Sequence, residues 1–278
     1  MFQKIGTTTF ALIIALFLFA SCQSSYNRLL ESDDYELMYE KAFEYYEEED
    51  YARAASLLER IIPVFRGTGE ADRLNFYYAS TYYERGEYIM AAHHFSNFVR
   101  DFPNSEYTKE AYFLRAYCYY LQSPRPSLDQ TPTRRAIDQF EMFINRYPDS
   151  EKVPEAREYI EEMREKLIEK SYQSAKLYVE MEDYRAAIVA LKNSLKEYPD
   201  TKYREDILFL ILESSYLLAR NSVPERQIER YRSTLDEYYV FSEEFPESDY
   251  MSEARRYYEN SVNALESLTG DEYEEIEN

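Results

Sequence analysis

Apolar and aromatic side chains between positions 76 and 105 recur every three or four residues in two consecutive runs. The first run is Phe76, Ala79, Tyr82 and Tyr83, and the second is Tyr88, Ala91, Phe95 and Phe98. Such spacing places each run on one face of an α-helix. Gly86 separates the runs because glycine adopts the left-handed conformation of a helix C-cap. Pro103 ends the second run because proline cannot continue a helix. The segment predicts two short helices that pack against each other.

The same pattern recurs along the chain. Its closing aromatic residues are Phe65, Phe102, Tyr147, Tyr198 and Phe245, and eleven residues before them stand Ala54, Ala91, Ala136, Ala187 and Thr234. Proline follows four of the five aromatics. This order of small, aromatic and proline residues resembles the tetratricopeptide (TPR) repeat, although the spacing exceeds the roughly 34 residues of an ideal unit.

The pattern predicts an all-α, TPR-like superhelical solenoid of about five helix-turn-helix repeats. The extra length falls in a proline-rich insert at 122–132, a long helix over 153–168 and a break at 221–226. The predicted segments are 35–67, 72–106, 108–150, 153–202 and 204–268, followed by an acidic tail at 269–278 that we expect to be disordered.

The first 21 residues have the organisation of a secretory signal peptide. Lys4 precedes an apolar run over 10–20 that is too short to span a membrane. Ala20 and Ser21 stand before Cys22 as in a bacterial lipobox, which predicts cleavage there and acylation of Cys22, with palmitate among the acyl chains. An ordinary signal peptide with an incidental cysteine is the alternative. Residues 22–33 would then form the lipidated N-terminus and a polar tether, on the periplasmic face of the outer membrane.

Composition narrows the classes of partner. The chain has 31 tyrosines, no tryptophan and a formal net charge of −21. Tyrosine suits narrow seams between helices, because its ring packs while its hydroxyl reaches water or a partner. The negative charge argues against nucleic-acid binding and against lying flat on anionic lipid. It serves solubility or attracts a basic patch on a partner protein.

No residues form a recognisable catalytic or cofactor site. Cys118 lies among aromatic residues and is expected to be a buried small hydrophobe. His93 and His94 are adjacent, so on a helix they diverge and do not share a metal ion. The run at 47–49 is glutamate on a repeat helix, which is typical of exposed charge. We therefore predict a non-enzyme without cofactor or metal.

The repeat register predicts a binding groove. In TPR-like units the first helices line the concave side, and their small seam residues here are Ala42, Ala79, Ala116 and Ala175. The residues three before and four after each seam should lean toward that groove: Tyr39, Tyr46, Phe76, Tyr83, Phe113, Tyr120, Tyr172 and Val179. Glu47 and Glu84 flank it, which suits a peptide with aromatic and basic side chains. Packing of these rings between neighbouring repeats is the alternative.

Together, the lipobox, the tether and the repeats resemble the BamD family of lipoproteins from the β-barrel assembly machinery. The local matches are 101–107 (DFPNSEY), 146–150 (RYPDS), 197–201 (EYPDT) and the insert before 134–140 (RRAIDQF). The resemblance covers about residues 22–220, and the fifth repeat departs from it.

This resemblance implies a scaffold that binds a BamA-like insertase through its C-terminal repeats. Its N-terminal repeats would bind incoming unfolded outer-membrane proteins, and other assembly lipoproteins would be further partners. The positions carried over to the insertase interface are Tyr184, Arg204, Tyr231 and Phe245. A different periplasmic TPR lipoprotein, acting in division or secretion, is an alternative because it would have the same lipobox, tether and repeats. A glycan-binding TPR lipoprotein fits less well, because such sugar platforms use tryptophan.

Overall fold

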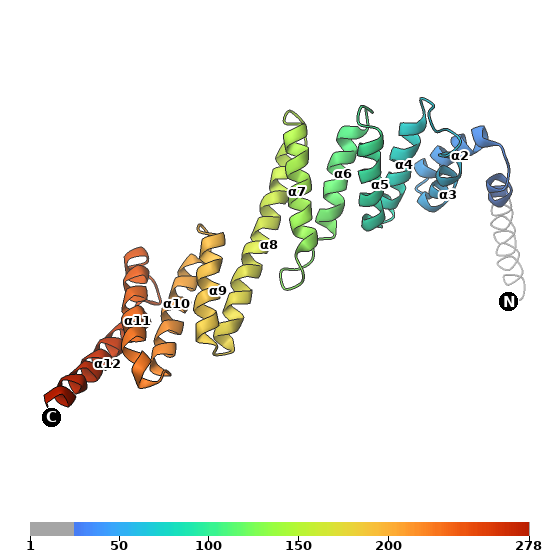
Figure 1. Cartoon of the computed structure of the whole chain (residues 1–278). Helices are drawn as coiled ribbons and strands as arrows, with labels where there is room; N and C mark the ends of the chain where they lie inside the picture. The colour runs from blue at the N-terminus through green and yellow to red at the C-terminus, as the bar shows by residue number, and fades with distance from the viewer. Residues whose placement is uncertain (1–24, 278) are drawn as a thin grey trace, which may run out of the picture. The chain divides into compact units, whose positions relative to one another are not determined.

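The computed structural model describes the backbone of residues 25–277 and the side chains to residue 269. Every regular element in that range is a helix (Figure 1). After a helical segment at 25–30 the helices are α2 Tyr35–Glu47, α3 Tyr51–Ile61, α4 Ala71–Glu84, α5 Tyr88–Asp101, α6 Thr108–Leu121, α7 Thr131–Arg146, α8 Val153–Glu180, α9 Tyr184–Glu197, α10 Arg204–Arg220, α11 Pro224–Glu244 and α12 Met251–Glu277. The predicted all-α, TPR-like fold is confirmed, as is the long helix from Val153. The predicted insert and break are non-helical over 122–130 and 221–223, and the last residues of both predicted spans belong to α7 and α11.

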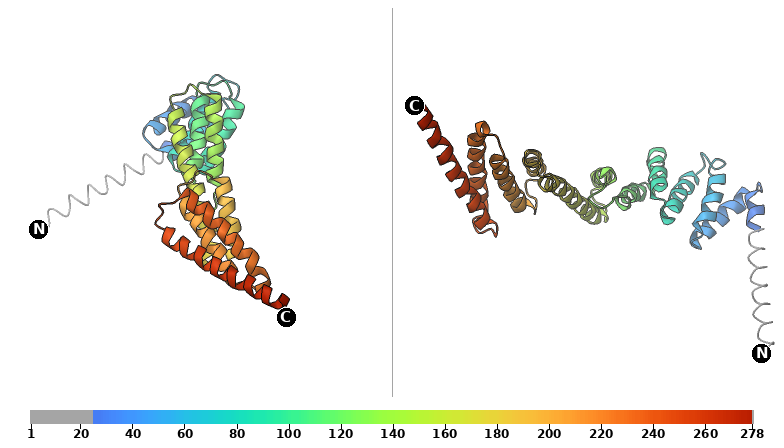
Figure 2. Two further views of the ribbon diagram at one scale, coloured as in Figure 1. Left: turned by 90° about the vertical axis from the view of Figure 1, so that its left-hand side faces the viewer. Right: turned by 90° about the horizontal axis from the view of Figure 1, so that it is seen from below.

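The chain forms two compact units that divide within α8. Unit 1 contains α2 to α7 and α8 as far as Met163. Unit 2 contains α8 from Arg164 and the helices α9 to α12, together with 125–129 from the insert. Within each unit, neighbouring helices in the chain pack against each other, as the two views of Figure 2 show.

The small seam residues are buried between the packed helices. None is more than 2 % exposed: Ala42, Ala79, Ala116 and Ala175 in the first helices, and Ala54, Ala91, Ala136, Ala187 and Thr234 in the second. Large apolar side chains such as Phe95, Phe140 and Leu191 are fully buried beside them. Burial of each large side chain stabilises the fold by about 1.5–3 kcal/mol, so these seams hold the helix pairs together.

The closing aromatics end their helices by a shared conformation. Phe102, Tyr147, Tyr198 and Phe245 are C-caps, with φ between −131° and −127° and ψ between 60° and 74°. Each precedes proline, whose ring excludes the preceding residue from the α conformation. The helix must therefore stop at the aromatic residue. The half-buried rings of Phe102, Tyr147 and Phe245 then pack on the core.

Aspartates begin several of the helices. The side chains of Asp34, Asp50 and Asp183 accept hydrogen bonds from the backbone N–H groups of Leu37, Arg53 and Ala186. Such N-caps satisfy backbone donors that have no partner within the helix. They fix the start of α2, α3 and α9 directly after a turn.

The two chain ends differ from a simple tether and tail. The expected signal peptide, 1–21, and Cys22 lie outside the described residues. Within the expected tether at 22–33, residues 25–30 are helical and Tyr26 is buried, with its ring 5.4 Å from the guanidinium of Arg53. At the other end α12 continues to Glu277 where we expected disorder from residue 269. Gly270 alone interrupts a run of helix-tolerant residues there, and one glycine costs only about 1 kcal/mol.

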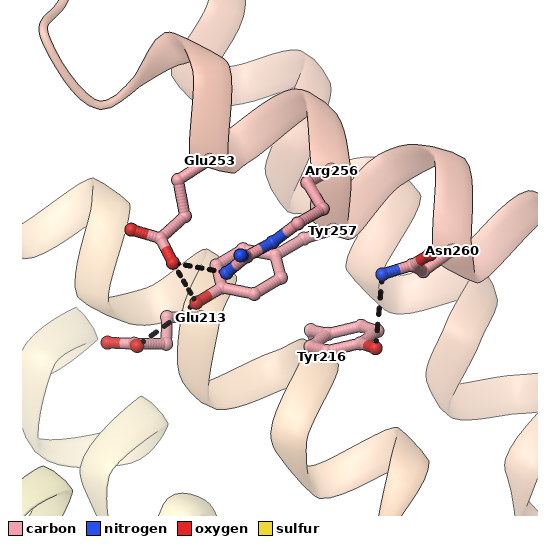
Figure 3. A network of polar contacts seen from close by, with 6 residues as sticks. All are labelled: Glu213, Tyr216, Glu253, Arg256, Tyr257 and Asn260. Atoms are coloured by element: carbon pink, nitrogen blue, oxygen red, sulfur yellow. Dashed lines mark hydrogen bonds and ion pairs between the residues drawn. The ribbon is translucent and has the colours of Figure 1, made fainter.

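The fifth repeat gains a third helix, because α12 packs on both α10 and α11. The rings of Tyr257 and Tyr216 stack 4.8 Å apart, and the Tyr257 hydroxyl lies 3.0 Å from Glu253 and 3.1 Å from Glu213 (Figure 3). Asn260 Nδ2 donates to the Tyr216 hydroxyl at 3.4 Å. α12 thereby packs over apolar side chains of α10 such as Phe209 and Tyr216.

Candidate functional site

Unit 1 contains a groove of about 570 Å³ between its first helices. α2, α4 and α6 line it, together with Lys152 before α8 and Glu155 in the first turn of α8. Its lining residues are Tyr46, Phe76, Tyr77, Ser80, Tyr83, Glu84, Glu110, Phe113, Leu114, Tyr117, Lys152 and Glu155. The groove is therefore aromatic along its length and charged at its edges.

Two phenylalanines form the floor of the groove. Phe76 is 9 % exposed and its ring lies 5.9 Å from Phe95. Phe113 is 3 % exposed and its ring lies 5.7 Å from Phe140. Each ring thus packs on the second helix of its own repeat while one edge faces the groove.

Tyrosine pairs bridge neighbouring repeats and form the walls. The rings of Tyr46 and Tyr77 meet edge to face at 4.9 Å, joining α2 to α4. Those of Tyr83 and Tyr117 lie 6.3 Å apart and join α4 to α6. All four side chains are half-buried. Both interpretations of the sequence hold at once, because the rings pack between repeats and still line the groove.

Charged groups make the groove acidic. Glu84, Glu110 and Glu155 line it, and Lys152 is the cation among its lining residues. Lys152 Nζ lies 3.1 Å from Glu110 Oε1 and 4.2 Å from the ring centroid of Phe113. Partial burial and the nearby Glu49 raise the pKa of Glu84. Burial also raises the pKa of Tyr83 to about 12, further above neutral pH than that of an ordinary tyrosine.

The sequence located part of this groove. Of the eight groove positions assigned to the first three repeats, the structure places Tyr46, Phe76, Tyr83, Phe113 and Glu84 in the lining. Tyr39 instead donates a 2.6 Å hydrogen bond to Glu70, and Tyr120 donates one of 2.6 Å to Glu162. Glu47 is exposed outside the lining.

Other lining residues were missed. Ser80 and Tyr117 stand one residue after the seams Ala79 and Ala116, on the same helical face as the assigned positions. Extending the register by that position would have found both. Lys152 precedes α8 and lies outside the repeat register, so the periodicity carried no signal for it.

The later positions are mainly structural. Tyr172 is buried, with its ring stacked 4.4 Å from Tyr203, and Val179 packs on the core of unit 2. Among the positions assigned to a partner interface, Tyr231 is 6 % exposed and Phe245 packs on that core. Both rings therefore contact this chain itself.

The other two assigned positions lie nearer the surface of unit 2. Arg204 pairs with Glu244 through two hydrogen bonds and donates a third, of 3.0 Å, to the carbonyl of Pro199. Tyr184 is half-buried at the start of α9. The guanidinium is therefore already occupied within the chain, while Tyr184 retains an exposed edge.

Of the side chains considered for chemistry, Cys118 and His94 are packed into the repeats, whereas His93 and the glutamates at 47–49 are exposed. Cys118 is fully buried, as expected, and burial raises the pKa of its thiol to about 12. His94 stacks on Tyr82 at 4.7 Å, and burial lowers its pKa. Among residues 25–277, no helix is both long and apolar enough to cross the hydrocarbon core of a bilayer.

Stacked helix pairs with an aromatic groove define a helical-repeat protein of the TPR type. Over residues 31–229 the chain matches the family model YfiO, described as outer membrane lipoprotein, and it belongs to this family. The family assignment predicted from the lipobox and the repeats is thereby confirmed.

Curated relatives carry the description outer membrane protein assembly factor BamD. The chain is 24 % identical over 161 residues to the protein of Caulobacter vibrioides, covering 57 % of this chain and 53 % of that one. It is 22 % identical over 213 residues to that of Rickettsia prowazekii, covering 77 % and 81 %. It is 24 % identical over 172 residues to that of Vibrio cholerae, covering 58 % and 70 %. The match spans about half the length of the Caulobacter relative.

Solved TPR structures are also similar. The TPR domain of P58(IPK) matches with a TM-score of 0.40 at 14 % identity, over 87 % of this chain and 68 % of that one. The TPR2AB domain of yeast Sti1 matches with a TM-score of 0.38 at 12 % identity, over 82 % and 98 %.

Proposed function

We propose that this protein is a lipid-anchored scaffold of outer-membrane protein assembly, and that the groove of unit 1 binds extended segments of incoming outer-membrane proteins. The observation that carries the proposal is the groove itself, an acidic aromatic channel built from the first helices of consecutive repeats. Membership of the outer membrane lipoprotein family and similarity to BamD proteins supply the biological setting.

The groove suits an unfolded chain because tyrosine rings and carboxylates can bind many different sequences. Flat tyrosine rings bind aromatic and aliphatic side chains with little loss of their own conformational freedom. Glu84 and Glu155 attract basic side chains, while the field of Lys152 is partly neutralised by Glu110. A site of this kind distinguishes a chain with alternating aromatic and basic residues from an acidic one, without demanding one sequence.

The test measures binding of fluorescein-labelled C-terminal peptides of outer-membrane proteins to the full chain in detergent. Replacing Tyr83 and Tyr117 together by Ala removes the wall between α4 and α6, and we expect affinity to fall at least about tenfold. Tyr178→Ala is the matched control, because that ring is 41 % exposed in unit 2. Unchanged affinity of the double variant, with helicity retained by circular dichroism, would rule out the groove.

Unit 2 is proposed to bind the BamA-like insertase. Three apolar side chains on α8, the following turn and α9 are more than half exposed: Leu177, Met181 and Val189. They offer apolar area to a partner, whereas Tyr231 is buried and offers none. Leu177→Glu with Met181→Glu should abolish co-purification of the insertase from native membranes, as measured by quantitative mass spectrometry. Val64→Glu, at a 49 % exposed position in unit 1, should leave co-purification unchanged. Equal recovery with the double variant would refute this interface.

A further inference from the structure

The face of α6 that points away from the groove carries Tyr112, Arg115 and Tyr119. Their spacing of three and four residues places them along one line of the helix. Arg115 stands two residues from both Phe113 and Tyr117, which line the groove, and two residues turn a helix through more than half a circle. This second surface is therefore distinct from the proposed peptide groove.

Arg115 is a buried cation without a counter-charge. Its side chain is 7 % exposed, and its Nε and Nη2 atoms have no hydrogen-bond partner in the part of the chain that the structure describes. Its guanidinium lies 4.7 Å from the ring centroid of Tyr112, and burial lowers its pKa. A buried charge is costly unless an opposite charge is close, so Arg115 calls for an anion that its own fold does not supply.

Two exposed arginines of α7 extend this positive surface. The guanidinium of Arg146 lies 5.3 Å from the same Tyr112 ring, and that of Arg135 lies 5.3 Å from the ring of Tyr119. Arg146 Nε donates to the hydroxyl of Tyr147 at 3.3 Å. Among the described residues, no carboxylate forms an ion pair with Arg115, Arg135 or Arg146.

This arrangement is unusual in a chain whose net charge is −21. Carboxylates are abundant here, and Arg100 and Arg204 each pair with one. Arg115 and Arg146 instead share one tyrosine ring and repel each other. An anion that Arg146 binds beside the ring of Tyr112 would also be attracted by the charge of Arg115. This attraction is strong because Arg115 is buried in surroundings of low polarity.

We propose that Tyr112, Arg115, Tyr119, Arg135 and Arg146, the arginine–tyrosine strip, bind an acidic segment of a partner protein in extended conformation. Guanidinium groups bind carboxylates through paired hydrogen bonds, and the rings between them accept the aliphatic stems of such side chains. From Tyr112 to Tyr119 the helix rises about 10.5 Å. Same-face side chains of an extended segment recur about every 6.4–6.8 Å, so two carboxylates fit along the strip.

The test uses two fluorescein-labelled peptides and the full chain in detergent at low salt. One peptide alternates Glu with Thr, and the other has Gln in place of each Glu. We expect the Glu peptide to bind and the Gln peptide to bind at least about tenfold more weakly. Arg146→Gln, an exposed change, should lower affinity for the Glu peptide about tenfold. Arg134→Gln, the matched control, removes the same charge from an exposed neighbour and should have little effect.

Arg115→Met separates binding from a purely structural role. Because the variant replaces an unpaired buried cation with an apolar side chain, we expect the melting temperature to rise while affinity for the Glu peptide falls. A lowered melting temperature would show that Arg115 is already satisfied within the fold. Equal binding of the two peptides, or unchanged affinity of Arg146→Gln, would overturn the proposal.

Discussion

Glu49 and Gly86 occupy the same position of successive repeats and share one left-handed backbone conformation. Their φ angles are 61° and 74°, and each stands two residues before the second helix of its pair. Glu182 has a φ of 59° at the same place in the fourth repeat. Glycine adopts this conformation freely, whereas a residue with a Cβ pays about 1–2 kcal/mol.

We therefore expect opposite effects at the two positions. Gly86→Ala should lower the free energy of unfolding by about 1 kcal/mol. Glu49→Gly should raise it by up to about 1 kcal/mol, since the relieved strain exceeds the entropy that glycine adds to the unfolded chain. Urea denaturation followed by circular dichroism measures both. Glu40→Gly, at an exposed position inside α2, should destabilise by about 1 kcal/mol. A destabilised Glu49→Gly variant would contradict the strain argument.

Membrane attachment is predicted to depend on Cys22, which lies outside the described residues. Replacing it with Ser removes the thiol that would carry the lipid, and each buried methylene of an acyl chain contributes about 0.8 kcal/mol to anchoring. The variant should move to the soluble fraction on alkaline extraction of membranes. Cys118→Ser is the matched control, because Cys118 is buried in unit 1 and should leave attachment unchanged. Retention of the Cys22→Ser protein in membranes would contradict the anchor.

The helix pairs could be read from the sequence because their determinants are local. Small residues such as Ala79 and Ala91 are needed where the two helices of a repeat pack closely. An aromatic residue followed by proline ends a helix because proline excludes the preceding residue from the α conformation. Those constraints lie within one repeat, so spacing alone revealed them. The same spacing gave the part of the groove that lies directly over a seam.

The rest of the groove depends on how one repeat is placed on the next. Its lining uses the last turn of α2 at Tyr46, most of α4, α6 as far as Tyr117, and Lys152 and Glu155 at the start of α8. A sequence register assigns equivalent positions in each repeat and cannot indicate which turn is used. The equivalent of Arg115 one repeat earlier is Tyr78, so periodicity also gave no sign of a buried cation.

The carboxyl of Glu84 is expected to link groove chemistry to pH. Its pKa is raised, first by burial and then by Glu49. The native state therefore holds this proton more tightly than the unfolded chain, whose glutamate pKa is about 4.3. Ionisation of Glu84 destabilises the fold above the native pKa, and that effect disappears below the unfolded value.

Glu84→Gln should accordingly raise stability at pH 7 and lose this advantage as the pH falls below about 4.3. It should also weaken binding of basic peptides at pH 7, because one groove carboxylate is gone. Urea denaturation across the pH range and peptide anisotropy measure the two effects. Glu48→Gln, an exposed change outside the groove, should show neither. A stability difference that grows on acidification would have the wrong sign.

The hydroxyl of Tyr257 supports the packing of α12 on α10. It lies within hydrogen-bond distance of both Glu213 and Glu253, and Arg256 also pairs with Glu253 (Figure 3). One hydroxyl has one proton and donates to one carboxylate at a time, so Tyr257→Phe removes a single charge-assisted bond. Because the ring still stacks on Tyr216, we expect a loss of about 1–2 kcal/mol. Tyr258→Phe, whose hydroxyl contacts only Tyr239 among the described residues, should cost less. Hydrogen exchange of α12 amides should speed up in the first variant and not in the second; equal protection would mean that stacking alone holds the helix.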